Sequence, residues 1–142
     1  MDARNKSGHD EAGWPMNGYL LVFLGAGIGG AVRHGVNLAS ARAFGPAFPW
    51  VTLGVNVIGS FAMGLLAGYL AHRTSAEWTH PGRLLLGTGL LGGFTTFSAF
   101  TLDAMVLWER GQGGLAAAYV LASVLLSVGG LVGGLALVRG LT

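Results

Sequence analysis

The sequence contains no cysteine and little charge. Without cysteine there are no disulfides, no thiolate metal sites and no redox centres of that kind. Only 10% of the 142 residues are charged, whereas a soluble domain carries about 25%. The net charge of +2 comes from flanks and loops, without a basic cluster that interleaves aromatic residues. Nucleic-acid binding is therefore not indicated.

Apolar residues and glycine are abundant instead. The chain is 52% hydrophobic, has 26 glycines and has a mean hydropathy of +0.61. Four uncharged stretches can each hold a helix of about 20 residues, enough to cross a bilayer. They are residues 12–32, 43–71, 84–102 and 111–138. The expected fold class is an all-α membrane protein with four transmembrane helices.

We expect two parts: a polar, disordered N-terminal tail at 1–17 and a four-span domain at 18–142. The predicted spans cover about 18–32, continuing as a more polar helix through Asn37, then 51–71, 83–108 and 115–138. Tryptophans at 14, 50, 78 and 108 lie beside these limits, as interfacial indoles do. The first span is read as retained rather than as a cleaved signal peptide, because Arg33 precedes the small-residue site at 39–41.

The positive charges that fix membrane orientation are balanced. Without the distal tail residues, one side has Arg73, Arg83 and Arg139, and the other has Arg33, Arg42 and Arg110. With so weak a bias, the chain is expected to insert in both orientations.

Small residues recur at four-residue spacing, which lets membrane helices approach closely. The ridges are Gly25/Gly29, Ser60/Gly64/Gly68, Gly89/Gly93, Gly129/Gly133 and Gly130/Gly134. Four short helices enclose little volume, so a pore requires a second copy, and we predict a homo-oligomer.

The third span is predicted to be broken at its centre. The segment Gly92–Phe100 reads GGFTTFSAF, and a Gly-Gly pair weakens a helix where lipid offers no water. Broken backbone is tolerated there only if it is buried in protein or lines a cavity. Carbonyls at such a break suit an alkali cation, and the following half-helix N-terminus suits an anion.

Polar residues in the other spans are candidate site residues. Asn56 lies deep in span two and is either an interhelical hydrogen-bonding group or an amide donor to an anion. Tyr119, Ser123 and Ser127 form one hydroxyl stripe along span four.

Aromatic and charged candidates accompany the break. Phe97 and Phe100 share a helix face, and their ring edges are positive enough to receive a small anion. Asp103 is expected near one mouth of the path that an anion would follow through the protein. Arg33 either draws anions into a vestibule or extends to the interface.

These residues resemble the small fluoride channels called Fluc or CrcB. The matching segments are GGAVR at 29–33, TLGVNVIGSF at 52–61, GGFTTFSAF at 92–100 and the tyrosine–serine stripe. The resemblance extends from about residue 18 to the C-terminus.

The resemblance implies an antiparallel, dual-topology homodimer with two fluoride pores in a bacterial inner (plasma) membrane. It implies passive export of fluoride and a structural Na⁺ ion at the dimer interface, held by the backbone carbonyls of Gly92 and Thr95. Arg33 and Asp103 would belong to the vestibule. The implied pore residues are Asn56, Phe97, Ser98, Phe100, Tyr119, Ser123 and Ser127.

The sequence departs from the family pattern at three positions. Ala99 stands where threonine is usual, Thr101 where serine is usual, and Asp103 where glutamate is usual. These changes alter any vestibule hydrogen-bond network built on those side chains.

Two alternatives belong to other classes. A four-span, dual-topology multidrug exporter needs an intramembrane carboxylate, and spans one and two have none. A structural membrane subunit without transport accounts for the glycine ridges but not for Asn56, the Thr-Thr break and the hydroxyl stripe. The sequence has no nucleophile–base pair at a plausible depth, so an intramembrane enzyme is not indicated.

Overall fold

The computed structural model describes residues 14–142, with side chains from residue 17 onward, and this range contains only helices and connecting turns. Most of the predicted tail, residues 1–13, lies outside the described residues. Four helical segments are long and apolar enough to cross a membrane: 17–44, 50–71, 79–109 and 113–141. The prediction of an all-helical protein with four such spans is confirmed.

The first two spans are single α-helices. Helix α2 (Trp14–Phe44) begins four residues before the predicted start and continues through the polar stretch around Asn37. It ends before Gly45, whose φ of +65° suits the residue that follows a helix. After a short loop, α3 runs over Trp50–Ala71.

The third span consists of several helical segments. It starts at α4 (Thr79–Gly82), inside the predicted loop, because Pro81 is tolerated in a first helical turn. It continues as the π-helix η1 (Arg83–Leu91), α5 (Gly92–Phe94) and, after two residues, α6 (Phe97–Glu109).

The last two spans are joined by a tight turn. Gly111 has a φ of +78°, and the amide of Gln112 donates to the carbonyl of Leu107 at 3.0 Å. This pairing satisfies carbonyls at the end of α6. Helix α7 (Gly113–Leu141) then runs back along the molecule.

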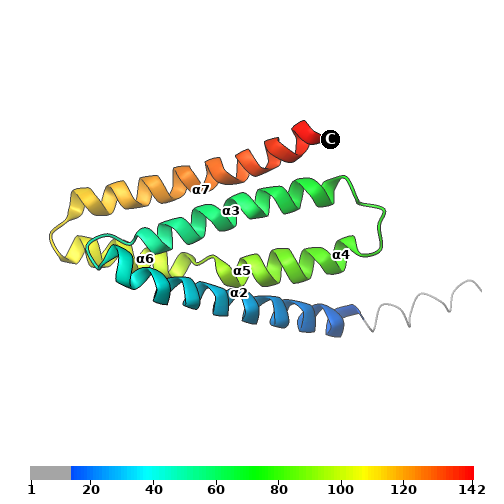
Figure 1. Cartoon of the computed structure of the whole chain (residues 1–142), viewed down its shortest axis with the longest axis horizontal. Coiled ribbons are helices and arrows are strands. Elements are labelled where there is room, and N and C mark those ends of the chain that lie inside the picture. The colour runs from blue at the N-terminus through cyan, green and yellow to red at the C-terminus, as the bar shows by residue number, and fades with distance from the viewer. Residues whose placement is uncertain (1–13) are drawn as a thin grey trace, which may run out of the picture.

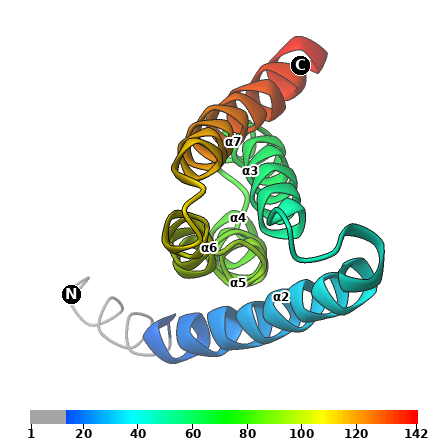
Figure 2. The same cartoon turned by 90° about the vertical axis from the view of Figure 1, so that its left-hand side faces the viewer.

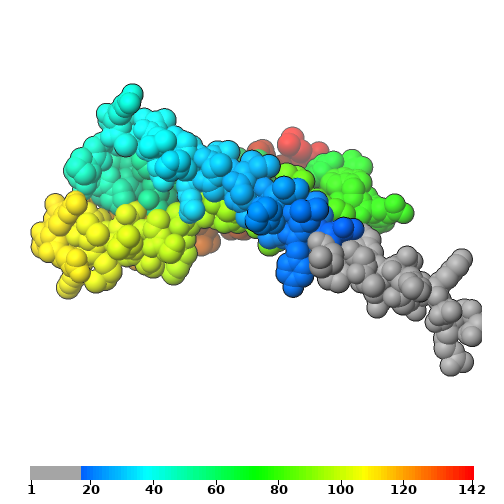
Figure 3. All heavy atoms as spheres, turned by 90° about the horizontal axis from the view of Figure 1, so that it is seen from below, coloured from blue at the N-terminus to red at the C-terminus, as the bar shows by residue number. Residues whose placement is uncertain are grey.

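The helices lie lengthwise beside one another (Figure 1). Seen from the end, α3 and α7 lie side by side, while α2 lies on the opposite flank of the third span (Figure 2). On the face shown in Figure 3, α2 and α6 lie at the surface and hide most of α7. A buried cluster of Leu53, Phe100, Leu107, Ala116 and Tyr119 forms the core at the α6–α7 end.

Glycines bring α2 against the third span. A Cβ at Gly29 would lie 2.8 Å from the amide nitrogen of Phe94, and one at Gly25 would lie 2.8 Å from that of Leu90. Gly93 in turn meets the backbone of Ala26. Gly92 and Gly93 are helical, so the expectation that they interrupt the helix is wrong. Gly93 serves close packing, and the extended backbone comes two residues later.

Glycines also bring α3 against α7. Gly64 faces the backbone of Leu131, and a Cβ at Gly134 would meet the Phe61 carbonyl and the Leu65 amide. Among the described residues, no atom outside the nearby backbone of α7 lies within 4 Å of a Cβ built at Gly129 or Gly133. Within this part of the chain, Gly130/Gly134 is the predicted ridge of α7 that packs against another helix, and Gly129/Gly133 is not.

Neighbouring glycines on α7 give a matched stability test. Gly134→Ala should lower the free energy of unfolding by about 1–3 kcal/mol, because the added methyl group forces α3 and α7 apart. Gly133→Ala should leave stability unchanged or slightly raised, since its methyl group meets open space. Thermal unfolding of both variants in detergent measures the difference. Equal effects of the two substitutions would contradict this packing.

Candidate functional site

The third span is interrupted at two residues in extended backbone. Thr95 has φ −76° and ψ 160°, and Thr96 has φ −152° and ψ 119°. The Thr95 hydroxyl donates to the Leu91 carbonyl at 3.0 Å, at the end of α5. The Thr96 hydroxyl accepts from the Ala99 amide at 3.2 Å and caps the start of α6. The Thr-Thr pair thus ends one helix and begins the next.

Asn56 of α3 holds this interruption from the neighbouring helix. Its Oδ1 accepts from the Thr96 amide at 2.8 Å, and its Nδ2 donates to the Thr96 carbonyl at 3.0 Å. One side chain therefore pairs with both the backbone amide and the backbone carbonyl of Thr96, a residue that has left the helix. The Thr96 amide, which would bond the Gly92 carbonyl in a continuous helix, is turned to Asn56 instead.

Close packing keeps Asn56 in place. A Cβ at Gly59 would clash with the Thr95 methyl group and lie 3.3 Å from the Phe94 ring. The turn of α3 that follows Asn56 therefore lies directly against the interruption.

A cavity of about 320 Å³ lies between the interruption, α3, α6 and α7. We call it the hydroxyl pocket. It has no charged side chain, and its lining combines hydroxyl and amide groups with apolar residues. The lining residues are Asn56, Ser60, Thr95, Thr96, Phe97, Phe100, Ser123, Val124, Ser127 and Val128.

Ser123 is the most deeply buried hydroxyl of this pocket. It is 5% exposed, and its Oγ has no hydrogen-bond partner among the described residues. An unpaired buried hydroxyl is costly, which favours a ligand or water in the cavity beside it.

Aromatic rings form a row beside the pocket. Phe97 and Phe100 lie 5.5 Å apart between ring centroids, Phe100 and Tyr119 lie 5.4 Å apart, and Tyr119 and Phe48 lie 5.5 Å apart. Tyr119 is fully buried, and its hydroxyl donates to Asp103 Oδ2 at 3.3 Å. Phe100 is 8% exposed but Phe97 is 76% exposed. One face of the row is thus open on the single chain.

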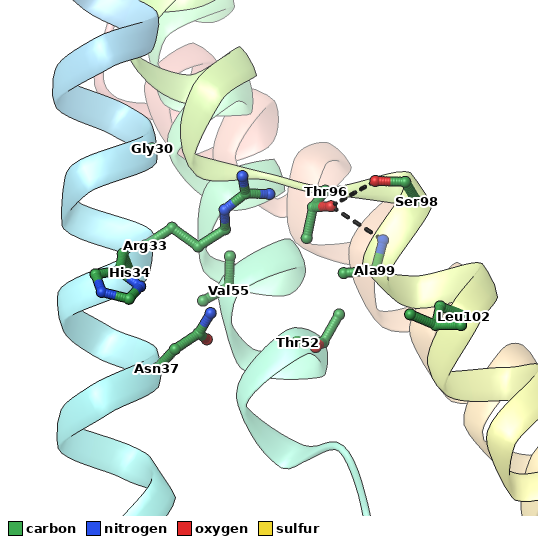
Figure 4. A pocket seen from close by; sticks show the side chains of 10 residues that line it. All are labelled: Gly30, Arg33, His34, Asn37, Thr52, Val55, Thr96, Ser98, Ala99 and Leu102. Atoms are coloured by element: carbon green, nitrogen blue, oxygen red, sulfur yellow. Dashed lines mark hydrogen bonds between the residues drawn. The ribbon is translucent and has the colours of Figure 1, made fainter.

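A second cavity lies between α2 and the interruption, with a volume of about 450 Å³ (Figure 4). We call it the α2 pocket. Arg33 reaches across it, and its Nη1 donates to the Thr95 carbonyl at 3.4 Å. The Ser98 hydroxyl lies 3.4 Å from that of Thr96. The lining residues are Gly30, Arg33, His34, Asn37, Thr52, Val55, Thr96, Ser98, Ala99 and Leu102.

A third cavity, of about 240 Å³, lies at the end of the bundle beside the loop at 45–49. Asp103, Thr52 and Arg110 contribute to its lining. Arg110 Nη1 donates to the Pro46 carbonyl at 3.2 Å and ties the α6–α7 turn to this loop.

The family of this chain is shown by comparison with known proteins. The family model described as "CrcB-like protein, Camphor Resistance (CrcB)" matches residues 20–135. The chain belongs to the CrcB-like family.

The CrcB-like chain matches several relatives over almost their whole length, and these relatives are named as fluoride channels. It is 60% identical over 124 residues to the fluoride-specific ion channel FluC 2 of Nitrobacter hamburgensis, covering 87% of this chain and 98% of the relative. It is 56% identical over 124 residues to the fluoride-specific ion channel FluC of Rhodopseudomonas palustris, with the same two coverages. Identity to the FluC of Beijerinckia indica is 52% over 127 residues, or 89% and 100% of the two chains. These names are those of ion channels, and the CrcB-like chain is not an enzyme.

The structure distributes the predicted site residues of the CrcB-like chain over the three cavities and the buried core. Asn56, Phe97, Phe100, Ser123 and Ser127 line the hydroxyl pocket. Tyr119 lies behind Phe100 and contacts Asp103. Ser98 lines the α2 pocket with Arg33, and Asp103 lines the cavity at the end of the bundle.

Two polar residues of the hydroxyl pocket were not among the predicted site residues: Ser60 and Thr96. Ser60 was assigned to a packing ridge, although its spacing of one turn from Asn56 places both on one face of α3. Thr96 was part of the expected break, but no sequence pattern indicates that its backbone amide and carbonyl are the partners of Asn56.

Proposed function

We propose that this protein is a fluoride-selective channel that lets cytoplasmic fluoride leave passively and so relieves fluoride toxicity. The observation that carries this proposal is the uncharged hydroxyl pocket halfway along the third span. Its lining includes the unpartnered buried hydroxyl of Ser123 and the rings of Phe97 and Phe100. Membership in the CrcB-like family and the names of its relatives, which are fluoride-specific ion channels, support it.

The chemistry of the pocket suits a small anion that must also leave. Hydroxyl hydrogens and ring edges are positive ends of dipoles and can replace part of a hydration shell. A fixed positive charge would hold fluoride too tightly, and the pocket has none. Arg33, in the α2 pocket, would raise the local concentration of anions without lying in the hydroxyl pocket.

The multidrug-exporter alternative lacks its central group. Proton-coupled export of cations requires a carboxylate that exchanges protons for substrate. Asp103 lines the cavity at the end of the bundle, accepts a hydrogen bond from Tyr119 and lies outside the hydroxyl pocket. A purely structural subunit has no use for an unpartnered buried hydroxyl.

The working form in this proposal is an antiparallel homodimer of dual topology. Phe97 lies open on the surface of one chain beside the hydroxyl pocket, so a second copy would complete the wall there. The balanced distribution of arginine supports insertion both ways round. The membrane would be the bacterial inner membrane.

A structural sodium ion at the interruption is part of this proposal. The Gly92 carbonyl has lost its helical donor, because the Thr96 amide donates to Asn56 instead, and the Thr95 carbonyl keeps one lone pair besides the one that accepts from Arg33. These two carbonyls would hold Na⁺, as backbone oxygens at a helix break hold alkali cations. Two oxygens are few for such an ion, so two copies would share it and the ion would stabilise their interface.

Fluoride efflux from liposomes tests the proposed function. Vesicles that contain the purified protein should release fluoride rapidly, as read by a fluoride electrode, and should retain chloride under the same gradient. Protein-free vesicles are the control. Equal release of both ions, or no fluoride release from well-folded protein, would contradict a fluoride-selective channel.

The absence of native cysteine allows a simple test of orientation. Ser75→Cys places one thiol in the exposed loop between α3 and α4. A membrane-impermeant maleimide should label about half of the protein in intact cells and all of it after permeabilisation, because both orientations are present. Labelling of all or none of the protein in intact cells would exclude dual topology.

A further inference from the structure

Ser60 is a polar residue of the hydroxyl pocket that was not among the predicted site residues. It lies on α3, one turn after Asn56, and is half-buried at the pocket wall. A serine in a membrane helix usually bonds back to its own helix. Among the described residues, the Ser60 hydroxyl has no hydrogen-bond partner, whereas Thr95 makes such a back-bond to Leu91. The Ser60 hydroxyl is therefore free to donate into the cavity.

Asn56 is the α3 residue that was expected to donate to the anion, but most of the hydrogen-bonding capacity of its side chain is already used. Its Oδ1 accepts from the Thr96 amide, and one N–H of its Nδ2 donates to the Thr96 carbonyl. Only the second N–H of the amide remains for a ligand. The α3 wall thus has one spare amide hydrogen and one spare hydroxyl.

The facing wall supplies matching donors. Ser123 of α7 is buried with an unpartnered Oγ, and Ser127 lies one turn further along. Gly130 fixes the spacing of the two walls, because a Cβ there would lie 3.2 Å from the Val57 carbonyl and 3.6 Å from the Phe61 amide. These two α3 residues flank Ser60 in the sequence. The hydroxyls of α3 and α7 therefore line one narrow cavity between closely packed backbones.

We propose that Ser60 donates a hydrogen bond to permeating fluoride and acts as a specificity-determining residue of the pore, together with Ser123 across the pocket. This inference rests on the proposed fluoride channel and adds a residue to it. A dehydrated small anion needs several donors at once, and neutral hydroxyls supply them while still allowing release. Asn56 is then mainly a positioning residue that holds the interruption.

Two substitutions of equal shape isolate the hydroxyl. Thr and Val differ only in a hydroxyl and a methyl group, so Ser60→Thr and Ser60→Val place the same volume in the pocket. Fluoride efflux from liposomes should be at least about tenfold slower for Ser60→Val than for Ser60→Thr, since a hydrogen bond to a charged group contributes that much or more. The ratio of fluoride to chloride flux should fall in the same variant.

The controls separate this inference from the proposed function. The same pair at Ser40, on α2 and outside the three cavities, should give equal fluoride fluxes. Size-exclusion profiles report whether each variant is folded. If Ser60→Thr and Ser60→Val conduct equally, at whatever level, Ser60 is not a donor, even though the wild-type channel conducts. If the wild type releases no fluoride, it is the proposed function itself that fails.

Discussion

The paired hydrogen bonds between the Asn56 side chain and the backbone amide and carbonyl of Thr96 are the interaction on which the site depends. A helix that is interrupted inside a membrane leaves polar backbone groups that water cannot satisfy. One carboxamide on α3 replaces the partner that the Thr96 amide has lost, at 2.8 Å, and also donates to the Thr96 carbonyl, at 3.0 Å. Because this bond pair comes from another helix, it also fixes the position of α3 relative to the third span.

Other features of the site follow from this arrangement. With the Thr96 amide turned to Asn56, Thr95 and Thr96 can cap the ends of α5 and α6 with their own side chains. Helix α6 then starts at Phe97 and brings Phe100 against Tyr119. Glycine contacts on both sides, α2 against η1 and α5 and α3 against α7, allow the close approach that the short interhelical bonds require.

Four spans could be predicted from the sequence because apolar runs and their charged limits follow directly from the cost of burying charge in lipid. The ends were less accurate at Trp14 and Thr79, where helix continues into less apolar residues. The π-helix η1 has no sequence signature that distinguishes it from an α-helix. The polar candidates of the site could also be named from the sequence. Their division between cavities could not, because Ser98 and Ser123 line different cavities as a result of the direction that α6 takes after the interruption. Ser60 was overlooked because serine also suits a packing ridge.

The central claim is that Asn56 holds the backbone of Thr96 through its amide and carbonyl, and amide hydrogen exchange tests it most directly. In the wild-type protein, the Thr96 amide should exchange slowly, like the amides of the flanking helices, although Thr96 itself is not helical. In Asn56→Ala, that amide should exchange much faster, while the amides of α7 remain protected. Fast exchange at Thr96 in the wild type, at the rate of the exposed loop at 72–78, would contradict the account.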